Sequence, residues 1–552
     1  MKQWRVRHGR TEGALEAKCI VDALLEARGV FSEEERENFL NPRLQNLADP
    51  LRLPDIREAV ERVERAIAHG EEILIYSDYD VDGMTSGALM FRFLKTLGAR
   101  VDVFLPERIS EGYGLTLEGL SRALQSRNPK LLIALDCGTT SVKEIQHLNE
   151  HGIEVIVIDH HELPQQLPAA IALVNPHRSS EDDHALATVG LVFKFCHALL
   201  KLRDAAELFD LKKHLDIVAL GTVADLAPLQ NDNRIFVQQG LKHMAKTQHV
   251  GLRELIRRAG VKGTLTSTTC GFILGPRLNA SGRMAQGRAG WELLATDDGE
   301  LARQIAEDLE SLNRKRQKVE QDVMNETEAW MEKNFDAERD RGIVVASRDW
   351  HQGVVGIVAS RLMRRYHRPT IVIAVDEKGQ CKGSCRSVED CSLMDVLRGC
   401  GEDLEAFGGH AMAAGIEINE DKIESFREHF NAWLRENVSE ECFHPKLHID
   451  FELRGHELNG KLASELDKME PFGRGNPEPV FMVREAEFTS PLKIFNQRHL
   501  KFRARAEGNE FDVVAFNMAK QVPPSRNPTL AGHWEIDDYS GFPCFRLVDW
   551  MI

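Results

Sequence analysis

Short, nearly continuous apolar runs alternate with helix-like segments between residues 51 and 225. The runs are ILIY (73–76), VDVFL (101–105), LLIAL (131–135) and VIVI (155–158). Strands that are apolar throughout and are separated by helical periods are typical of a parallel sheet with helices on both faces. The pattern therefore predicts an α/β fold built on a doubly wound parallel sheet.

Acidic residues follow three of these runs directly. SDYDVDG comes after ILIY, DCG after LLIAL, and DHH after VIVI. In an open parallel sheet, ligands bind at the carboxyl edge, near the point where the strand order reverses. We therefore expect these acidic side chains to converge on one site.

The rest of the chain predicts three further parts. Residues 300–335 contain no Gly or Pro and repeat apolar residues at a helical period, so at about 1.5 Å per residue they predict a connecting helix of roughly 50 Å. Strand-like GIVVAS and TIVIAV flank a helical segment, which predicts a smaller α/β domain over about 340–440. From about 446 onward, five candidate strands separated by turns predict a small β-barrel of the OB type.

Composition narrows the class of protein. A chain of 552 residues with 42% hydrophobic residues predicts a soluble globular protein of three or four domains at roughly 100–200 residues each. The most apolar runs are far shorter than the roughly 20 residues of a membrane span, and the first residues lack a signal-peptide core. Ten scattered cysteines indicate a reducing compartment, so we expect a cytoplasmic protein. The net charge of -16 still leaves room for a local basic groove.

The strongest local signal is the run Asp78-Tyr79-Asp80-Val81-Asp82-Gly83. On an extended segment its three carboxylates would point to one side, where they repel one another unless a cation neutralises them. The alternatives are an acidic surface loop or an EF-hand loop. An EF-hand needs Glu at its twelfth position, where this chain has Leu89, so a metal site is favoured.

Asp136, Asp159-His160-His161 and Asp225 extend this set. Each alone could be a helix cap or an ordinary polar side chain. Together they form an oxygen-rich set with one or two imidazoles, which suits two Mn²⁺ or Mg²⁺ ions better than zinc. We infer a two-metal site for phosphoryl chemistry.

Two groups of motifs resemble a known family. DYDVDG, LDCG, IDHH and VADLAPL, in this order, resemble the motifs of the DHH phosphoesterase superfamily. GPRLNASGR (275–283), HQGVVGIVASRL (351–362), KGSCRS (382–387) and FGGHAMAAG (407–415) narrow the resemblance to the RecJ family of single-strand exonucleases. It implies 5′ to 3′ degradation of single-stranded DNA with Mn²⁺ or Mg²⁺, in DNA repair and recombination. It also implies an N-terminal segment (1–50), a DHH catalytic domain (51–295), the connecting helix (296–337), a DHHA1-type domain (338–442) and an OB-fold DNA-binding domain (443–552).

The resemblance also implies roles for single residues. One metal is expected on Asp78, Asp80 and a bridging Asp136, although related pyrophosphatases carry His where this chain has Tyr76. The other metal is expected on Asp82, Asp136, His160 and Asp225. The residues expected at the scissile phosphate are His161, Arg277, Asn279, His351 and His410. Those expected at a 5′ phosphate are Arg108 facing Ser384 and Arg386 across a cleft.

Basic and aromatic residues predict contacts with the DNA strand. Arg283 is expected to clamp the backbone, and the barrel residues expected to bind DNA are Lys493, Phe495, Arg498, Lys501, Phe502, Arg503 and Arg505. Basic side chains track phosphates while aromatic rings stack bases. The alternative is that these charges are only the wet face of a strand, and that FGGHAMAAG is only a set of tight turns. A single-strand-binding protein and a RecQ-type helicase are the partners that the family implies.

Two other functions remain open. A small-substrate DHH hydrolase would act on pyrophosphate, short oligoribonucleotides or cyclic dinucleotides, but it needs neither a long helix nor a barrel. A catalytically inactive DNA-binding scaffold would have no reason to keep clustered charges. The cysteines at 381, 385, 391 and 400 lack the paired spacing of a zinc site, so we expect free thiols.

Overall fold

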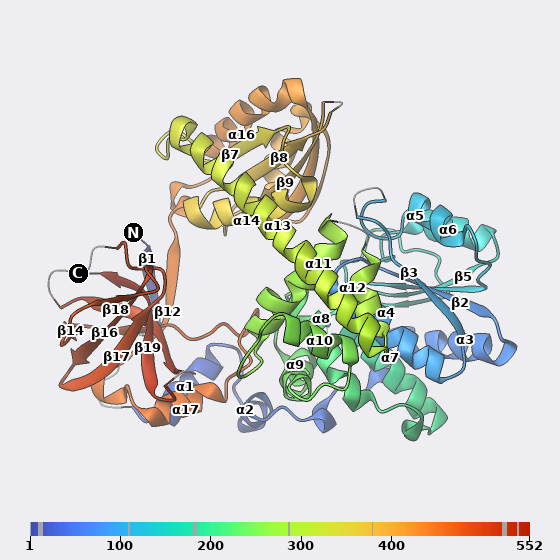
Figure 1. Ribbon diagram of the computed structural model, residues 1–552, viewed down its shortest axis with the longest axis horizontal. Helices are drawn as coiled ribbons and strands as arrows, with labels where there is room; N and C mark the ends of the chain where they lie inside the picture. The colour runs from blue at the N-terminus through green and yellow to red at the C-terminus, as the bar shows by residue number, and fades with distance from the viewer. Residues whose placement is uncertain are drawn as a thin grey trace. The chain divides into compact units, whose positions relative to one another are not determined.

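The computed structural model describes residues 2–8, 15–108, 111–179, 185–284, 287–377, 379–521, 527–537 and 540–551. The chain forms two compact units. The larger unit comprises Arg5–Gly282, Gln286–Leu309 and His448–Ile552, and the smaller unit comprises Met1–Trp4, Arg283–Ala285 and Glu310–Leu447. Figure 1 shows the elements of both.

A parallel sheet organises the first part of the larger unit. Its strand order is β3-β2-β4-β5-β6, and every neighbouring pair is parallel. The strands are β2 (Glu72–Ser77), β3 (Arg100–Phe104), β4 (Leu131–Leu135), β5 (Glu154–Ile158) and β6 (Ala172–Val174). The four apolar runs of the sequence are β2 to β5, so this part of the prediction is confirmed, and β6 was missed because three residues carry too short a pattern.

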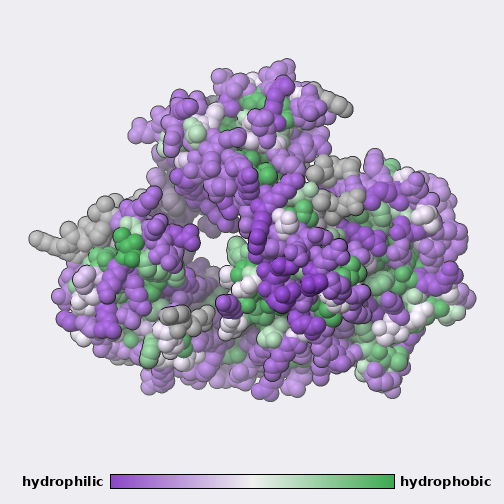
Figure 2. All heavy atoms as spheres, in the orientation of Figure 1, coloured by the Kyte–Doolittle hydropathy of each residue, from purple (hydrophilic) through white to green (hydrophobic). Residues whose placement is uncertain are grey.

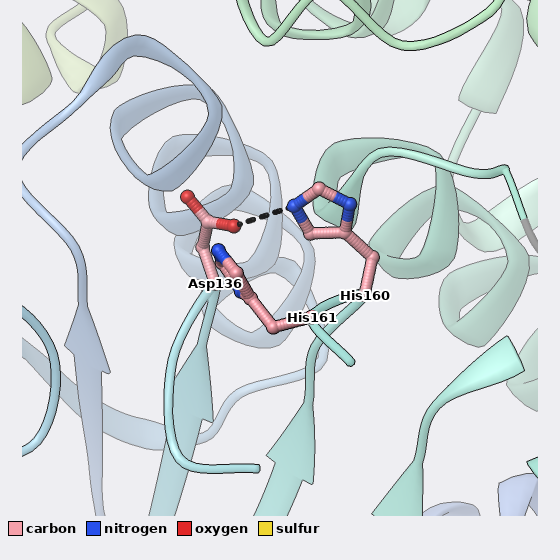
Figure 3. Close-up of side chains that lie close together, drawn as sticks. All are labelled: Asp136, His160 and His161. Carbon is pink, nitrogen blue, oxygen red and sulfur yellow. Dashed lines mark ion pairs between the residues drawn. The ribbon is translucent and has the colours of Figure 1, made fainter. Parts of the chain in front are cut away.

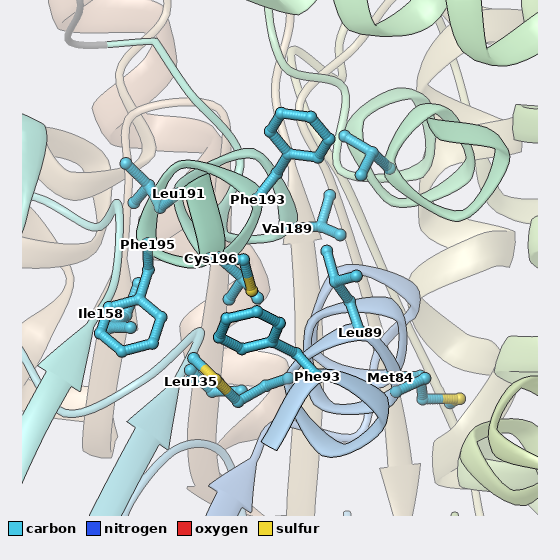
Figure 4. Close-up of a cluster of buried hydrophobic side chains, with 14 of the residues drawn as sticks. Met84, Leu89, Phe93, Leu135, Ile158, Val189, Leu191, Phe193, Phe195 and Cys196 are labelled. Atoms are coloured by element: carbon cyan, nitrogen blue, oxygen red, sulfur yellow. The ribbon is translucent and has the colours of Figure 1, made fainter. Parts of the chain in front are cut away.

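Helices cover both faces of this sheet. Ile73 and Ile75 of β2 pack into one hydrophobic core, whereas Leu74 and Tyr76 pack into another on the opposite face. The first core includes residues of α3 (Ile56–His69), α4 (Val81–Thr96), α7 (Thr188–Arg203) and α8 (Leu215–Ala224), and Figure 4 shows side chains of this core. The second includes residues of α5 (Leu117–Leu124) and α6 (Val142–Glu150). The doubly wound α/β prediction is therefore confirmed.

Further helices of the larger unit follow the sheet. They are α9 (Asn231–Met244), α10 (Val250–Arg258), a π-helical segment (Thr269–Leu274), α11 (Gly275–Met284), whose last two residues belong to the smaller unit, and α12 (Arg288–Ala295). The motif GPRLNASGR therefore lies in a helix, α11.

The predicted connecting helix is α13 (Gly299–Asn334). Its 36 residues span about 54 Å at about 1.5 Å per residue. Ala302, Ile305 and Leu309 near its start join the core of the larger unit, whereas Val323 and Met331 pack in the smaller unit. A helix that has no Pro, and no Gly after its first residue, thus carries the chain from one core to the next.

The smaller unit is the predicted second α/β domain. Its sheet order is β10-β11-β9-β8-β7, with β7 and β8 parallel and the other pairs antiparallel. The motif FGGHAMAAG forms the turn of the β10–β11 hairpin. The elements are β7 (Ile343–Ser347), α14 (Gln352–Tyr366), β8 (Thr370–Val375), β9 (Gln380–Arg386), α15 (Leu393–Gly399), β10 (Leu404–Gly409), β11 (Ala413–Asn419) and α16 (Ile423–Asn437).

The C-terminal sheet has the order β1-β12-β13-β18-β19-β17-β16-β14, with β15 paired to β16. The OB-type prediction is confirmed, but the candidate strands are divided more finely than predicted. One of them, LKIFNQRHLKFRAR, is a hairpin, because Asn496 and Gln497 adopt left-handed φ angles of 47° and 62° and reverse the chain. The strands are β1 (Gln3–His8), β12 (Lys446–Glu452), β13 (Phe481–Val483), β14 (Glu487–Phe488), β15 (Lys493–Phe495), β16 (His499–Ala506), β17 (Asn509–Ala515), β18 (Thr529–Ile536) and β19 (Pro543–Met551).

The N-terminal segment belongs to this C-terminal core. Ile20 and Leu24 of α1 (Ala17–Glu26) pack with Leu462 of α17 (Gly460–Asp467) and with barrel residues. A second N-terminal helix, α2 (Glu33–Leu40), follows a capping box at Ser32. Sequence patterns did not reveal this association, because it joins segments more than 400 residues apart.

The described cysteines are free, and Cys381, Cys385, Cys391 and Cys400 are buried. This confirms the prediction of free thiols at these four positions. Among the helices that the structure describes, none is both long enough and apolar enough to cross a membrane. In Figure 2 the visible face of each unit is mainly hydrophilic, and hydrophobic residues form separate patches.

A buried ion pair generates the first prediction. Lys194 on α7 and Asp232 on α9 form an ion pair, with side chains 2% and 5% exposed, and both also bond the backbone of Ala48. Lys194→Met should lower the free energy of unfolding by about 3–5 kcal/mol in a urea titration, because it leaves a buried carboxylate without its partner. The double variant Lys194→Met/Asp232→Leu should lose clearly less. A double variant that loses the sum of both single losses would show that the two charges are not coupled.

Candidate metal centre

The acidic residues converge at the carboxyl edge of the parallel sheet. Asp78 follows β2 and Asp136 follows β4, and these strands are neighbours although β3 comes between them in sequence. β3 lies on the other side of β2, so the strand order reverses between β2 and β4. Both carboxylates therefore stand at the topological switch point, where open α/β sheets bind ligands.

The segment 78–83 is not extended, which corrects one expectation. Asp80 caps helix α4, with its Oδ1 accepting a hydrogen bond from the backbone N–H of Gly83 at 3.0 Å. Asp82 already lies in the first turn of this helix. The turn is so tight that a Cβ on Gly83 would stand 2.3 Å from the carbonyl oxygen of Asp78. A strand-to-helix turn, rather than a strand, gathers the three carboxylates.

The predicted ligand residues form overlapping groups. Within each group, one candidate ligand atom per residue lies within 4.8 Å of the others. Asp136 belongs to two of them, and its carboxylate lies 3.4 Å from Nε2 of His160, as Figure 3 shows. The groups are Asp78, Asp80 and Asp136; Asp82, His160 and Asp225; and Asp136, His160 and His161.

The first residues of helix α7 form hydrogen bonds with carboxylates of the metal centre. The sequence analysis did not predict these contacts. The backbone N–H groups of Thr188 and Val189 donate to the two carboxylate oxygens of Asp82 at 2.7 and 2.9 Å. The Thr188 hydroxyl donates to Oδ1 of Asp136 at 3.0 Å. The N–H groups at a helix N-terminus stabilise a negative charge, so this contact favours ionised Asp82. The surrounding LATVG is apolar and offered no signal.

Asp159 and Tyr113 hold His161 from its two sides. Oδ1 of Asp159 lies 2.6 Å from Nδ1 of His161, and the Tyr113 hydroxyl lies 2.7 Å from Nε2. Asp159 also accepts the backbone N–H groups of His160 and Thr139. The Asp-His-His spacing could have identified Asp159 as an orienting residue, since such carboxylates commonly hold an imidazole. The sequence analysis assigned a role to the nearby Arg108 but none to Tyr113.

Burial and like charges act against ionisation in this centre. Burial, reinforced by the charge of Asp225, raises the pKa of Asp82 to about 7. Burial, reinforced by the charge of Asp80, raises the pKa of Asp225 to about 7. The pKa values of Asp78 and Asp136 are also raised, first by burial and then by the neighbouring carboxylates. The cluster therefore holds all its negative charges at neutral pH only when a cation offsets them.

The two histidines differ. Burial lowers the pKa of His160, so its imidazole is neutral and suited to bind a metal. Burial also acts to lower the pKa of His161, but the hydrogen bond and charge of Asp159 raise it to about 9. His161 is therefore a cation at neutral pH, better suited to a phosphate than to a metal.

The donor set fits divalent cations. Both carboxylate oxygens of Asp78 and Nε2 of His160 are buried without a hydrogen-bond partner among the described residues. Such atoms are costly unless something binds them. Oxygen donors with one neutral imidazole suit Mn²⁺ or Mg²⁺.

Comparisons with known proteins agree with this geometry. Residues 72–222 match the DHH family N-terminal domain, 340–436 the DHHA1 domain and 449–547 the RecJ OB domain. The single-stranded-DNA-specific exonuclease RecJ of Haemophilus influenzae is 35% identical over an alignment that covers 96% of this chain and 95% of that protein. The chain belongs to the RecJ family.

Two other RecJ proteins are similar to this chain over most of its length. That of Bacillus subtilis is 36% identical over 94% of this chain, which spans 66% of the length of that protein. The crystal structure of Thermus thermophilus RecJ in complex with Mn²⁺ matches with a TM-score of 0.84 and 28% identity, covering 100% of this chain and 79% of that one. The matched structure thus binds a metal that the carboxylates of this chain suit.

The RecJ-like motif lies on α11, where Gly275 approaches Val81 and Ala224, the neighbours of two predicted ligands. Arg277 is half-buried and donates to the carbonyl of Ile273 at 2.7 Å, and Asn279 is also half-buried. Arg283 donates to the carbonyl of Gly353 at 3.0 Å. These residues remain predictions as DNA contacts.

The predicted 5′-phosphate residues lie in both units. In the smaller unit, Arg386 donates to the Ser384 hydroxyl at 3.1 Å. Gly356 of α14 faces this pair, since a Cβ there would stand 3.0 Å from Ser384 Oγ and 3.3 Å from Arg386 Nη2. In the larger unit, exposed Arg108 stacks over the ring of Tyr79, with 5.4 Å to the ring centroid.

His351 and His410 both belong to the smaller unit. The Nδ1 atom of His351 accepts the backbone N–H of Gly353 and so caps α14. His410 is exposed in the β10–β11 turn. Their role at the scissile phosphate stays a prediction.

The barrel residues divide into two faces. Lys501, Arg503 and Arg505 are exposed on β16, but Phe502 between them is 2% exposed and packs in the barrel core against Phe488. The expectation that Phe502 stacks bases is therefore wrong, because neighbouring residues of a strand point to opposite faces.

The exposed basic residues of β15 and β16 differ in whether an acidic residue pairs with them. Arg503 pairs with Asp512 and Arg505 with Glu510, both at 3.0 Å. Lys493 and Lys501 stand directly opposite each other on β15 and β16. Like charges in this position destabilise a sheet, so an anion between them would be favoured.

An aromatic patch lies close to these lysines. Phe495 packs near His499 and Phe516, with ring centroids 5.0 and 6.4 Å away, and Phe516 is 49% exposed. Arg498 is exposed and donates to His499 at 3.1 Å. Sequence analysis missed Phe516, because a single Phe at a strand end gives no signal.

The raised carboxyl pKa values generate the second prediction. Below pH 7, Asp82 and Asp225 hold protons that a metal must displace, so the affinity for Mn²⁺ should fall as pH falls, by about tenfold per pH unit for each proton released. Calorimetric titration of the protein with Mn²⁺ between pH 5.5 and 8 measures this slope. Asp225→Asn should reduce the slope by one proton. An affinity that stays constant over this range would contradict the assignment of these carboxylates as ligands.

Proposed function

We propose that this chain is a metal-dependent exonuclease that hydrolyses single-stranded DNA from the 5′ end with two Mn²⁺ or Mg²⁺ ions. The observation that carries the proposal is the carboxylate cluster at the switch point, in which Asp136 belongs to more than one ligand group. The names of the RecJ relatives support the substrate. The family also supports a role in DNA repair and recombination in the cytoplasm, with a single-strand-binding protein and a RecQ-type helicase as partners.

The predicted ligand residues would divide between the two ions. Asp78, Asp80 and Asp136 would hold one, and Asp82, Asp136, His160 and Asp225 the other. When bound, such a pair of ions supplies an activated water molecule and neutralises the negative charge on the attacking and leaving oxygens. Thr188 keeps Asp136 oriented through its hydroxyl, and the N–H groups of α7 bond the Asp82 carboxylate and favour its ionised form.

Other residues would position the phosphates. His161, a cation whose Nδ1 is held by Asp159, would donate from Nε2 to an oxygen of the scissile phosphate in place of its contact with Tyr113, together with Arg277, Asn279, His351 and His410. Ser384, Arg386 and Arg108 would bind the 5′ phosphate, which carries more charge than an internal diester and suits guanidinium groups. Arg283 and the barrel would bind the rest of the strand.

The third prediction tests the activity itself. With Mn²⁺, 5′-labelled single-stranded DNA should release labelled mononucleotides at once, while 3′-labelled DNA shortens progressively. Duplex DNA, RNA and pyrophosphate should be cut much more slowly, and a chelator should stop the reaction. Asp136→Asn should lower the rate by more than about 10³-fold with an unchanged melting temperature, because the charge that balances both ions is lost. Release of label from the 3′ end first, or full activity with chelator, would refute the proposal.

The fourth prediction concerns the barrel. Replacing Lys493 and Lys501 with Ala should weaken binding to long single strands, and the log–log salt slope should fall by about 0.7 for each phosphate contact removed. The matched control, Arg503→Ala/Arg505→Ala, removes two arginines that already pair with Asp512 and Glu510, so it should change the slope less. Equal effects of the two double variants would show that the ion-paired face binds the strand as well.

A further inference from the structure

One arginine beside the metal centre comes from the far end of the chain. The segment 470–477, here called the rim segment, lies between α17 and β13 and reads EPFGRGNP. It touches the residues that follow Asp225: the Leu229 N–H donates to the carbonyl of Arg474 at 2.7 Å, and Gln230 Nε2 donates to that of Gly475 at 3.1 Å. Residues almost 250 positions apart thus lie side by side at the edge of the site.

A buried guanidinium fixes the backbone of the rim segment. Arg234 on α9 is 2% exposed and stacks over the ring of Phe39. A buried charge needs hydrogen bonds on every side, and here carbonyl groups supply them. The acceptors are the carbonyls of Phe39, Lys468, Met469, Glu470 and Pro471, at 2.7–3.5 Å.

Two more side chains fasten the segment. Asn476 donates through Nδ2 to the carbonyls of Met469 and Pro471 at 2.8 and 3.0 Å. Ser267, just before the π-helical segment, donates to the carbonyl of Phe472 at 2.6 Å. The Cα position of Arg474 is therefore set by contacts on both sides of it.

The side chain of Arg474 is by contrast little engaged. It is exposed, and Nη1 donates to the carbonyl of Leu226 at 3.5 Å, a distance at the limit of a hydrogen bond. It forms no ion pair with any residue that the structure describes. Leu226, the neighbour of Asp225, has a left-handed φ of 60°, which is unfavourable for a leucine and turns its carbonyl to the rim segment.

Arg474 lies close to Asp225. Its Nη1 atom contacts the carbonyl of Leu226, the residue that follows Asp225, and its backbone carbonyl accepts the N–H of Leu229. It forms no ion pair with Asp225. Its remaining N–H donors are available to an anion that enters the site.

We propose that Arg474 binds a phosphate of the DNA strand next to the scissile bond, on the Asp225 side of the metal centre. The proposal rests on the proposed function, because it takes single-stranded DNA as the substrate. A guanidinium on a fixed backbone fits a phosphate with paired N–H donors at little entropic cost. Its position beside the ligands would set the register of the strand on the metal centre.

Arg100 provides a matched control. It is an exposed arginine of the same unit, and Nη1 likewise donates to a carbonyl, that of Gly70, at 3.5 Å. It starts β3, at the amino edge of the sheet, whereas the carboxylates follow the carboxyl ends of the strands. Arg100→Ala therefore removes an equivalent local contact away from the site.

The experiment compares wild type, Arg474→Ala, Arg474→Lys and Arg100→Ala on 5′-phosphorylated single-stranded oligonucleotides. With Mn²⁺, Arg474→Ala should lower kcat/KM by about 10- to 100-fold, the effect of one charge-assisted contact. Anisotropy titrations without metal should show a log–log salt slope smaller by about 0.7. Arg474→Lys should restore the slope but only part of kcat/KM, and Arg100→Ala should match wild type.

Three outcomes would overturn the inference. In the first, Arg474→Ala keeps the wild-type kcat/KM and salt slope. In the second, the lower kcat/KM of Arg474→Ala is explained by a lower melting temperature or by weaker Mn²⁺ binding in the absence of DNA. In the third, Arg100→Ala loses as much kcat/KM as Arg474→Ala. A wild-type protein that leaves single-stranded DNA intact would instead refute the proposed function.

Discussion

Carboxylates buried together at one edge of a sheet are the constraint on which the rest of this structure depends. Asp78, Asp82 and Asp136 are almost fully buried, and their like charges repel one another. A fold keeps such a cluster only when other interactions offset its cost. In the part of the chain that the structure describes, the amide groups of α7, the Thr188 hydroxyl and the charge of His161 offset part of this cost, and divalent cations would supply the remainder.

Segments far apart in sequence hold the metal centre in place. Helix α2, α9 and the rim segment meet at Arg234, whose guanidinium donates to the carbonyls of Phe39 on α2 and of Glu470 in the rim segment. The same backbone contacts bring Arg474 to the edge of the acidic site. Arg234 and the rim segment thus link the chain before β13 to α2, α9 and the residues after Asp225 within the larger unit.

Much of the fold followed from local patterns. The apolar runs 73–76 and 131–135 predicted central strands because a strand covered on both faces must be apolar throughout. The acids at their ends predicted the site, since parallel strands present their carboxyl ends at one edge. The length of α13 followed from the absence of Gly and Pro in residues 300–335.

Contacts between distant segments could not be predicted. Thr188 and Arg474 act through positions that only the folded chain defines, and nothing in their neighbouring residues marks them. Phe502 was misassigned because a basic and aromatic composition does not tell which face of a strand each side chain takes, although its alternation with Lys501 and Arg503 contained that information. Asp82 was assigned to an extended segment because a helix that starts within a run of acids has no apolar signal there.

The most direct test of the central claim is the anomalous scattering of Mn²⁺ in crystals of this protein. The account predicts two peaks about 3.5–4 Å apart, with the carboxylate of Asp136 touching both. Asp78 and Asp80 should lie at one peak, and Asp82, His160 and Asp225 at the other. A single peak, or two peaks that do not share Asp136, would contradict the account.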